Sequence, residues 1–256
     1  MSEDRVAQDG MVQDWMAEER LVETTRGQAR VELRVSEASR ALLVMGPGAS
    51  GRPASDLFAL ADAVHAAGFS VALVTPPYAV AGRKIPPRGT ATDEAFVQVV
   101  AALREELGDQ PLITGGRSFG SRVACRTSAE IGSIGVLCLA FPLHPPGKPE
   151  QSRLEDLEAA TVPTLVVQGR SDAFGIPPEA EHRQVLLVDG DHSLRKDHER
   201  IGAAVVDWLE SLLTAGESSE HPQGEVRLGR RSRVGRCRSG YPVLALVRAA
   251  TAATGR

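Results

Sequence analysis

Apolar runs with the length of β-strands alternate with amphipathic helical segments along most of this 256-residue chain. Strands and helices that alternate in this way form a mainly parallel sheet with helices on both faces, so the predicted fold class is α/β. Residues 31–35 alternate apolar and polar side chains, which predicts a solvent-facing antiparallel edge strand that pairs with residues 20–25. The other expected elements are strands 41–45, 70–74, 112–114, 134–140, 164–168 and 184–188 and helices 54–67, 93–107, 152–160 and 197–213, with Ser55 as the N-cap of the first helix.

Composition divides the chain into three parts. Residues 1–19 form an acidic extension, residues 20–214 carry the alternating pattern, and residues 215–256 form a tail with eight arginines against three acidic residues. Because Gly, Ser and Arg dominate the first half of the tail, we expect a disordered extension. An Arg-rich tail can also bind nucleic acid or an acidic partner, but no aromatic interleaving supports that alternative.

The sequence argues against several classes of protein. No apolar run approaches the ~20 residues that a membrane-spanning helix needs, and the acidic N-terminus lacks the apolar core of a signal peptide. The three cysteines (Cys125, Cys138 and Cys237) are scattered and do not suggest a disulfide framework, so we expect a cytoplasmic location. Nothing has metal-ligand spacing, and we expect neither a metal nor another cofactor.

A G-x-S-x-G motif spans residues 116–120, directly after the apolar run 112–114 and before a helical segment. A sharp strand-to-helix turn lifts the serine hydroxyl out of the backbone, and glycines two residues to either side allow a tight turn. The serine also lies at a helix N-terminus, where backbone N–H groups favour developing negative charge. The context therefore predicts a nucleophile elbow with Ser118 as the nucleophile.

Two further polar residues, Asp172 and His192, each follow a strand-like run and belong at the same sheet edge as Ser118. The chain order Ser, Asp, His is that of the α/β-hydrolase fold and not of the other two serine-hydrolase lineages. In such a triad His192 takes the serine proton, and Asp172 holds the imidazole tautomer and orientation.

Other roles for these residues stay open. An aspartate after a strand is often a turn or N-cap residue, and a lone loop histidine is often a solvated surface residue. Asp189 and Asp191 flank the histidine and are rival acids. They rank below Asp172, because the third member of a triad normally comes from a different loop.

An oxyanion hole needs two N–H donors. One is expected from the backbone of Phe119, directly after the nucleophile. The second belongs to the glycine-rich loop after strand 41–45, where Pro47 has no N–H and leaves Gly48 or Ala49 as the donor. Such a loop can instead bind phosphate, but neither a following Lys-Ser/Thr nor a spaced G-x-G-x-x-G accompanies it.

Several loop residues with basic side chains could approach this edge, where a group of cations would suit a carboxylate or phosphate on the substrate. Arg117, next to the nucleophile, and His144 are the expected substrate-binding residues. The alternative for Arg117 is a side chain that points away and forms a salt bridge at the edge of the sheet.

The motifs resemble those of a dienelactone-hydrolase-like family of small α/β-hydrolases, which includes a testis-expressed mammalian protein and a subunit of the non-specific-lethal chromatin complex. The resemblance covers roughly residues 20–213 and rests on 77–84, 115–122, 141–149, 169–175 and 191–193. It implies an α/β-hydrolase fold without a large lid and hydrolase-like activity, but no particular substrate. Relatives tend to carry His-Gly-Ala-Gly where this chain has Met45-Gly46-Pro47-Gly48.

These observations lead to two hypotheses from different classes. The first is a serine hydrolase that acts on a small ester or thioester through an acyl-enzyme. The second is a non-catalytic scaffold of the same fold that binds a partner, and it is motivated by Pro47, the Arg-rich tail and the chromatin-associated relative.

Overall fold

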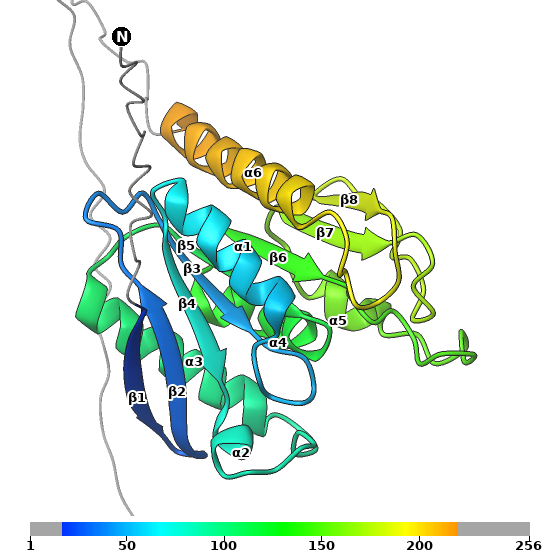
Figure 1. Ribbon diagram of the computed structural model, residues 1–256, viewed down its shortest axis with the longest axis horizontal. Helices are drawn as coiled ribbons and strands as arrows, with labels where there is room; N and C mark the ends of the chain where they lie inside the picture. Colours follow the sequence, from blue (N-terminus) through cyan, green and yellow to red (C-terminus); the bar gives the residue numbers. More distant parts are fainter. Residues whose placement is uncertain (1–16, 220–256) are drawn as a thin grey trace, which may run out of the picture. The chain divides into compact units, whose positions relative to one another are not determined.

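The computed structural model describes residues 17–219, which contain an eight-stranded sheet of order β1-β2-β4-β3-β5-β6-β7-β8 (Figure 1). The strands are β1 (Glu18–Thr24), β2 (Gly27–Arg34), β3 (Leu42–Gly46), β4 (Ser70–Thr75), β5 (Leu112–Arg117), β6 (Gly135–Leu139), β7 (Thr164–Gly169) and β8 (Arg183–Val188). The helices are α1 (Ser55–Ala66), α2 (Pro77–Val80), α3 (Ala91–Leu107), α4 (Phe119–Ile131), α5 (Leu154–Glu158) and α6 (His198–Ser219).

Strands β3 to β8 pair in parallel, and only the β1–β2 and β2–β4 pairs are antiparallel. The predicted α/β class with a mainly parallel sheet is therefore confirmed. The edge-strand prediction was wrong in one respect, because β2 lies between β1 and β4 and β1 forms the edge. The apolar side chains of β2, Ala29, Val31 and Leu33, are fully buried because they pack in the same cluster as α3.

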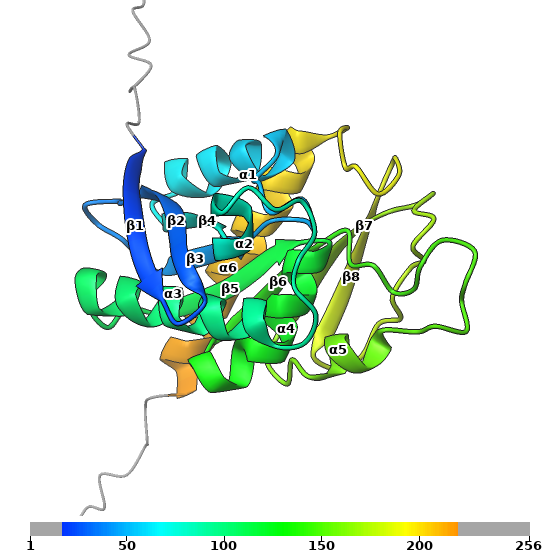
Figure 2. The same ribbon diagram turned by 90° about the horizontal axis from the view of Figure 1, so that it is seen from below.

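Helices cover both faces of the sheet (Figure 2). Side chains of α1 and α6 form one apolar cluster with strand residues such as Leu43, whereas side chains of α3 and α4 form another with residues such as Val44. Neighbouring residues on one strand thus enter opposite clusters, as the alternation of side chains along a strand requires. Burial on both faces explains why β3 has five buried residues in succession.

The observed elements depart from the predicted ones at a few ends. The N-cap of α1 is Ala54 rather than Ser55, and no side chain caps this helix. The short helix α2 was not predicted, although a proline at its first position is a known signal for a helix start. Helix α6 continues to Ser219, beyond the predicted end at residue 213.

The expectations for most of the acidic extension and for the Arg-rich tail fall on residues 1–16 and 220–256, outside the described residues. Within residues 17–219, no helix combines the length and apolar character that crossing a membrane requires.

Candidate active site

Ser118 stands alone between β5 and α4, with backbone angles φ 52° and ψ −108°. A positive φ is uncommon for a residue with a side chain and is kept only where the surroundings impose it. The N–H of Ser118 donates to the carbonyl of Leu139 on β6 at 2.8 Å, which fixes the turn to the neighbouring strand. Position and conformation are those of a nucleophile elbow.

Three glycines make this turn possible. A methyl group on Gly116 would lie 2.7 Å from the carbonyl oxygens of both Gly120 and Gly46, and a methyl group on Gly120 would collide with the Gly46 carbonyl. The elbow and the end of β3 are therefore in backbone contact, and a larger residue at these positions would separate them.

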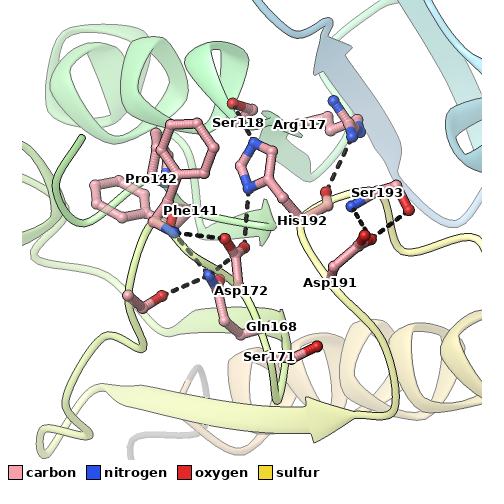
Figure 3. A network of polar contacts seen from close by, with 12 residues as sticks. Arg117, Ser118, Phe141, Pro142, Gln168, Ser171, Asp172, Asp191, His192 and Ser193 are labelled. Atoms are coloured by element: carbon pink, nitrogen blue, oxygen red, sulfur yellow. Dashed lines mark hydrogen bonds and ion pairs between the residues drawn. The ribbon is translucent and has the colours of Figure 1, made fainter. Parts of the chain in front are cut away.

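The structure brings the three predicted triad side chains together, and Figure 3 shows them in line. His192 Nε2 lies 2.9 Å from Ser118 Oγ, and His192 Nδ1 lies 2.9 Å from Asp172 Oδ2. Both distances fall in the range expected for a nucleophile, a general base and the residue that orients it. Ser118 follows β5, Asp172 follows β7 and His192 follows β8, so the parallel strands place all three at one edge.

The Asp172 carboxylate is fully buried and held from three sides. Besides His192, the backbone N–H of Phe174 donates to Oδ1 at 2.8 Å and the Gln168 amide donates to Oδ2 at 2.8 Å. The rival acids bond elsewhere, since Asp191 accepts from Ser193 and Asp189 pairs with Arg170.

Gln168, the fifth residue of β7, connects the acid to two loops. Its side-chain nitrogen lies 2.8 Å from the Gly175 carbonyl and 3.2 Å from the Phe141 carbonyl, in addition to its bond with Asp172. Its amide oxygen, by contrast, is buried without a hydrogen-bond partner. The side-chain nitrogen is a donor and faces three acceptor oxygens. A flipped amide would place its own acceptor oxygen against them, so the unpaired amide oxygen points the other way.

The loop between β3 and α1 approaches the nucleophile at Gly48. A methyl group on Gly48 would lie 4.0 Å from Ser118 Cβ. Among the described residues, the N–H groups of Gly48 and Ala49 donate no hydrogen bond, so both remain available to an oxyanion. The backbone of Gly48 therefore lies near the nucleophile, where an oxyanion hole needs a second N–H donor.

A small apolar cavity of ≈ 20 Å³ adjoins this loop and the elbow, and such a volume holds roughly one water molecule or a group of similar size. It is lined by Gly46, Pro47, Tyr78, Phe96, Phe119 and Val123, among others. The Tyr78 hydroxyl donates to the Ala49 carbonyl at 3.0 Å, and burial raises the pKa of Tyr78 to about 12. The Tyr78 hydroxyl thus holds the loop between β3 and α1 in place.

The two expected substrate-binding residues make contacts with the protein instead. The Arg117 guanidinium bonds to Asp56 and to the His192 backbone, in agreement with the alternative of a salt bridge. His144 Nδ1 lies 2.9 Å from the Pro145 carbonyl, and its ring lies against Gly175. The contact of each residue with a substrate stays a prediction.

Sequence reasoning missed Gln168 and Phe174 beside the triad and Asp56 beside Arg117. A signal existed for Gln168, because a single amide ends an otherwise apolar strand and buried amides need partners. Phe174 and Asp56 carry no comparable signal, since their roles depend on segments far away in the sequence.

Among residues 17–219, no cluster of three or more His, Cys, Asp or Glu side chains could hold a metal ion. Cys125 Sγ and Cys138 Sγ lie 3.4 Å apart as buried free thiols, and burial raises the pKa of Cys138 well above its ordinary value. These thiols pack in the core and take no part in the site.

Comparison with known proteins identifies the family and the fold. A family model described as "Alpha/beta hydrolase domain" matches residues 38–215. A lidless α/β serine hydrolase from Xanthomonas campestris is similar in structure, with a TM-score of 0.64, 16% identity, and coverage of 76% of this chain and 94% of that chain.

Two further solved structures share the fold. A dienelactone hydrolase from Anabaena variabilis gives a TM-score of 0.62 at 13% identity and covers 77% of this chain and 97% of its own. The esterase Pf2001 from Pyrococcus furiosus gives a TM-score of 0.63 at 13% identity, with 77% and 90% covered. At such low identity these structures show a shared fold and nothing more specific.

Proposed function

The chain belongs to the alpha/beta hydrolase domain family, and from that premise we propose that it is a serine hydrolase with Ser118, His192 and Asp172 as its catalytic triad. One observation carries the proposal: the His192 imidazole lies 2.9 Å from both the Ser118 hydroxyl and the Asp172 carboxylate. A strained serine, an imidazole and a buried carboxylate in this order match the requirements of acyl transfer.

In the proposed acylation step, His192 Nε2 accepts the Ser118 proton while Oγ attacks the carbonyl carbon of an ester. The oxyanion that forms accepts hydrogen bonds from the Phe119 N–H and the Gly48 N–H. His192 then gives its proton to the departing alcohol, and the acyl group remains on Ser118. Asp172 keeps the Nδ1 proton of the imidazole in place throughout.

In the proposed deacylation step, a water molecule takes the place of the alcohol. His192 accepts a proton from this water, and the hydroxide attacks the acyl carbon. When the second tetrahedral intermediate collapses, the proton returns to Ser118 Oγ and the carboxylic acid leaves. The cycle consumes one ester and one water and releases one alcohol and one acid.

The proposed substrates are small esters or thioesters. The cavity beside the elbow is apolar and has room for a group about the size of a methyl, and its lining includes Pro47 and Phe119. Within the described residues, the short helices α2 and α5 follow the carboxyl ends of β4 and β6, and the loops at this edge carry no lid domain. Few contacts are therefore available to select a long or branched substrate.

A fluorophosphonate probe tests the proposal, because it reacts with an activated serine and not with ordinary hydroxyls. We expect covalent labelling of the wild type and of Ser193→Ala, which removes a neighbouring hydroxyl that bonds to Asp191. Ser118→Ala, checked as folded by circular dichroism, should not be labelled. Hydrolysis of p-nitrophenyl acetate should follow the same pattern. A folded wild type without labelling and without hydrolysis would contradict the proposal and favour the non-catalytic scaffold.

A further inference from the structure

The Arg117 guanidinium turns away from the Ser118 hydroxyl and toward the chain segment that carries His192 (Figure 3). Its Nη2 donates to the backbone oxygen of His192 at 3.0 Å. Its Nε donates to Asp56 Oδ2 at 2.5 Å, in the first turn of α1. A single side chain at the end of β5 thus joins the histidine segment to a helix that follows the oxyanion loop.

We propose, building on the serine hydrolase function proposed above, that Arg117 and Asp56 are positioning residues that hold His192 in register with Ser118. In this role the Arg117–Asp56 pair touches neither substrate nor reacting atoms. It fixes the position of the His192 imidazole, and it affects kcat only through that position.

Burial makes the pair a fixed support. The side chain of Asp56 is 7% exposed and that of Arg117 is 19% exposed. A guanidinium keeps its charge at all relevant pH values, so a partly buried arginine needs a carboxylate partner. Asp56 Oδ1 in turn accepts the N–H of Leu57 at 3.0 Å, which fixes the carboxylate at the positive end of α1. A continuous series of hydrogen bonds therefore runs from the first turn of α1 through Asp56 and Arg117 to the backbone of His192.

Among the described residues, the other backbone bonds of the segment around His192 do not reach β5. The Gly190 carbonyl accepts the Ser171 N–H at 3.0 Å and the Ser171 hydroxyl at 2.8 Å, which attaches the segment to the loop after β7. Ser193 and Leu194 both donate to Asp191, and these bonds shape the turn without attaching it to β5. Leu194 and Asp197 have positive φ angles of 50° and 60°, which mark an irregular backbone. The bond from Arg117 ties the His192 backbone directly to the residue before the nucleophile, and so it sets their separation.

The same guanidinium also lies against the oxyanion loop. A methyl group on Gly48 would lie 3.2 Å from Arg117 Nη1. Arg117 thus contacts the histidine segment, borders the expected second oxyanion donor and directly precedes Ser118 in sequence. A small displacement here would disturb geometry that transition-state stabilisation needs and substrate binding does not.

The test measures turnover, substrate affinity and local order in the full-length chain. We expect Arg117→Met to lower kcat for p-nitrophenyl acetate roughly 10- to 100-fold while KM changes less than about threefold. Asp56→Asn should lower kcat in the same direction. Arg117→Lys should recover part of the loss, because one ammonium can replace only some of the bonds of a planar guanidinium.

Arg122→Met is the matched control. Arg122 also forms a partly buried ion pair, with Nε 2.6 Å from Asp156 Oδ2 and 24% of its side chain exposed, and it lies four residues after Ser118. Within the described part of the chain, its hydrogen bonds and ion pairs do not reach residues 189–197. We expect this variant to lose a similar amount of thermal stability as Arg117→Met and to keep kcat within about twofold.

Hydrogen exchange of the peptide that covers residues 189–197 provides a readout independent of activity. It should become faster in Arg117→Met and Asp56→Asn but not in Arg122→Met. If kcat and exchange in Arg117→Met match those of Arg122→Met, the positioning role is overturned. If Arg117→Met does not fold, Asp56→Asn decides by the same criteria. Absence of probe labelling in the wild type would instead contradict the proposed hydrolase function. The exchange measurement would still test whether Arg117 restrains the segment that carries His192.

Discussion

The phenyl ring of Phe174 lies against the imidazole of His192, with ring centroids 4.1 Å apart and planes tilted by 32°. The backbone N–H of Phe174 also donates to Asp172 at 2.8 Å. One residue therefore contacts both partners of the Asp172–His192 bond. The ring restricts imidazole rotation from one side, while Asp172 and Ser118 restrict it at the two nitrogens.

Truncation of this ring should reduce turnover. We expect Phe174→Ala to lower kcat about 2- to 12-fold, because an aromatic pair contributes roughly 0.5–1.5 kcal/mol beyond simple burial. Phe58→Ala, at another half-buried phenylalanine on α1, should reduce stability without this loss. Steady-state kinetics with p-nitrophenyl acetate measure the difference, and equal kcat values for the two variants would contradict the role of the ring.

Removal of the Gln168 amide should cost both stability and activity. Gln168→Leu removes one of the donors to the Asp172 carboxylate and leaves the Gly175 carbonyl without a donor among the described residues, whereas the Phe141 carbonyl keeps the N–H of Leu143. We expect a decrease of about 1–3 kcal/mol in the free energy of unfolding, because this is the cost of leaving one buried polar group, the Gly175 carbonyl, without a partner. Urea denaturation measures this loss, and kcat should fall with it. Gln184→Leu makes the same change at an exposed site of β8 and should be close to neutral.

The identity of the second oxyanion donor can be tested by removing one N–H at a time. Ala49 is the second residue of a turn closed by the Gly51 N–H to the Gly48 carbonyl at 2.8 Å, a position that accepts proline. We expect Ala49→Pro to keep the fold and to retain kcat within about threefold, because the proposed mechanism assigns the second donor to Gly48. A loss of roughly 10²- to 10³-fold with an unchanged melting temperature would assign the role to Ala49.

Alkaline pH should weaken the fold through Tyr78. Burial raises the pKa of Tyr78 from 10.0 to about 12, so between these pH values the unfolded chain loses a proton that the folded chain retains. The resulting contribution to stability is complete below pH 10 and disappears as pH rises toward 12, by no more than about 2–3 kcal/mol. Subtracting the unfolding free energies of Tyr78→Phe from those of the wild type isolates this effect, and a difference that does not change above pH 10 would contradict it.

Much of the fold could be predicted because it depends on local patterns. The alternation of strands and helices gave the parallel sheet, and each predicted strand lies within a few residues of an observed one. The order of Ser118, Asp172 and His192 could be read for a similar reason, since the ends of parallel strands meet at one edge. Edges themselves are a tertiary property, and for this reason β2 was misplaced as the outermost strand.

The parts of the site that escaped prediction depend on contacts between distant segments. Asp56 lies 61 residues before Arg117, and no local pattern distinguishes it from the exposed charges of other helices. Arg117 was recognised as notable because it precedes the nucleophile, but its sequence position does not say which way the side chain turns. The sequence position of His144 likewise does not say that its ring lies against Gly175, and its contact with a substrate stays a prediction.

The backbone of Ser118, with φ 52° and ψ −108°, is held in a conformation that disfavours any residue with a side chain. A laboratory evolution experiment that rewarded heat resistance alone should therefore drift toward glycine at this position and discard the hydroxyl. To obtain a more heat-resistant variant that keeps its activity, the experiment would also have to select for hydrolysis of the substrate.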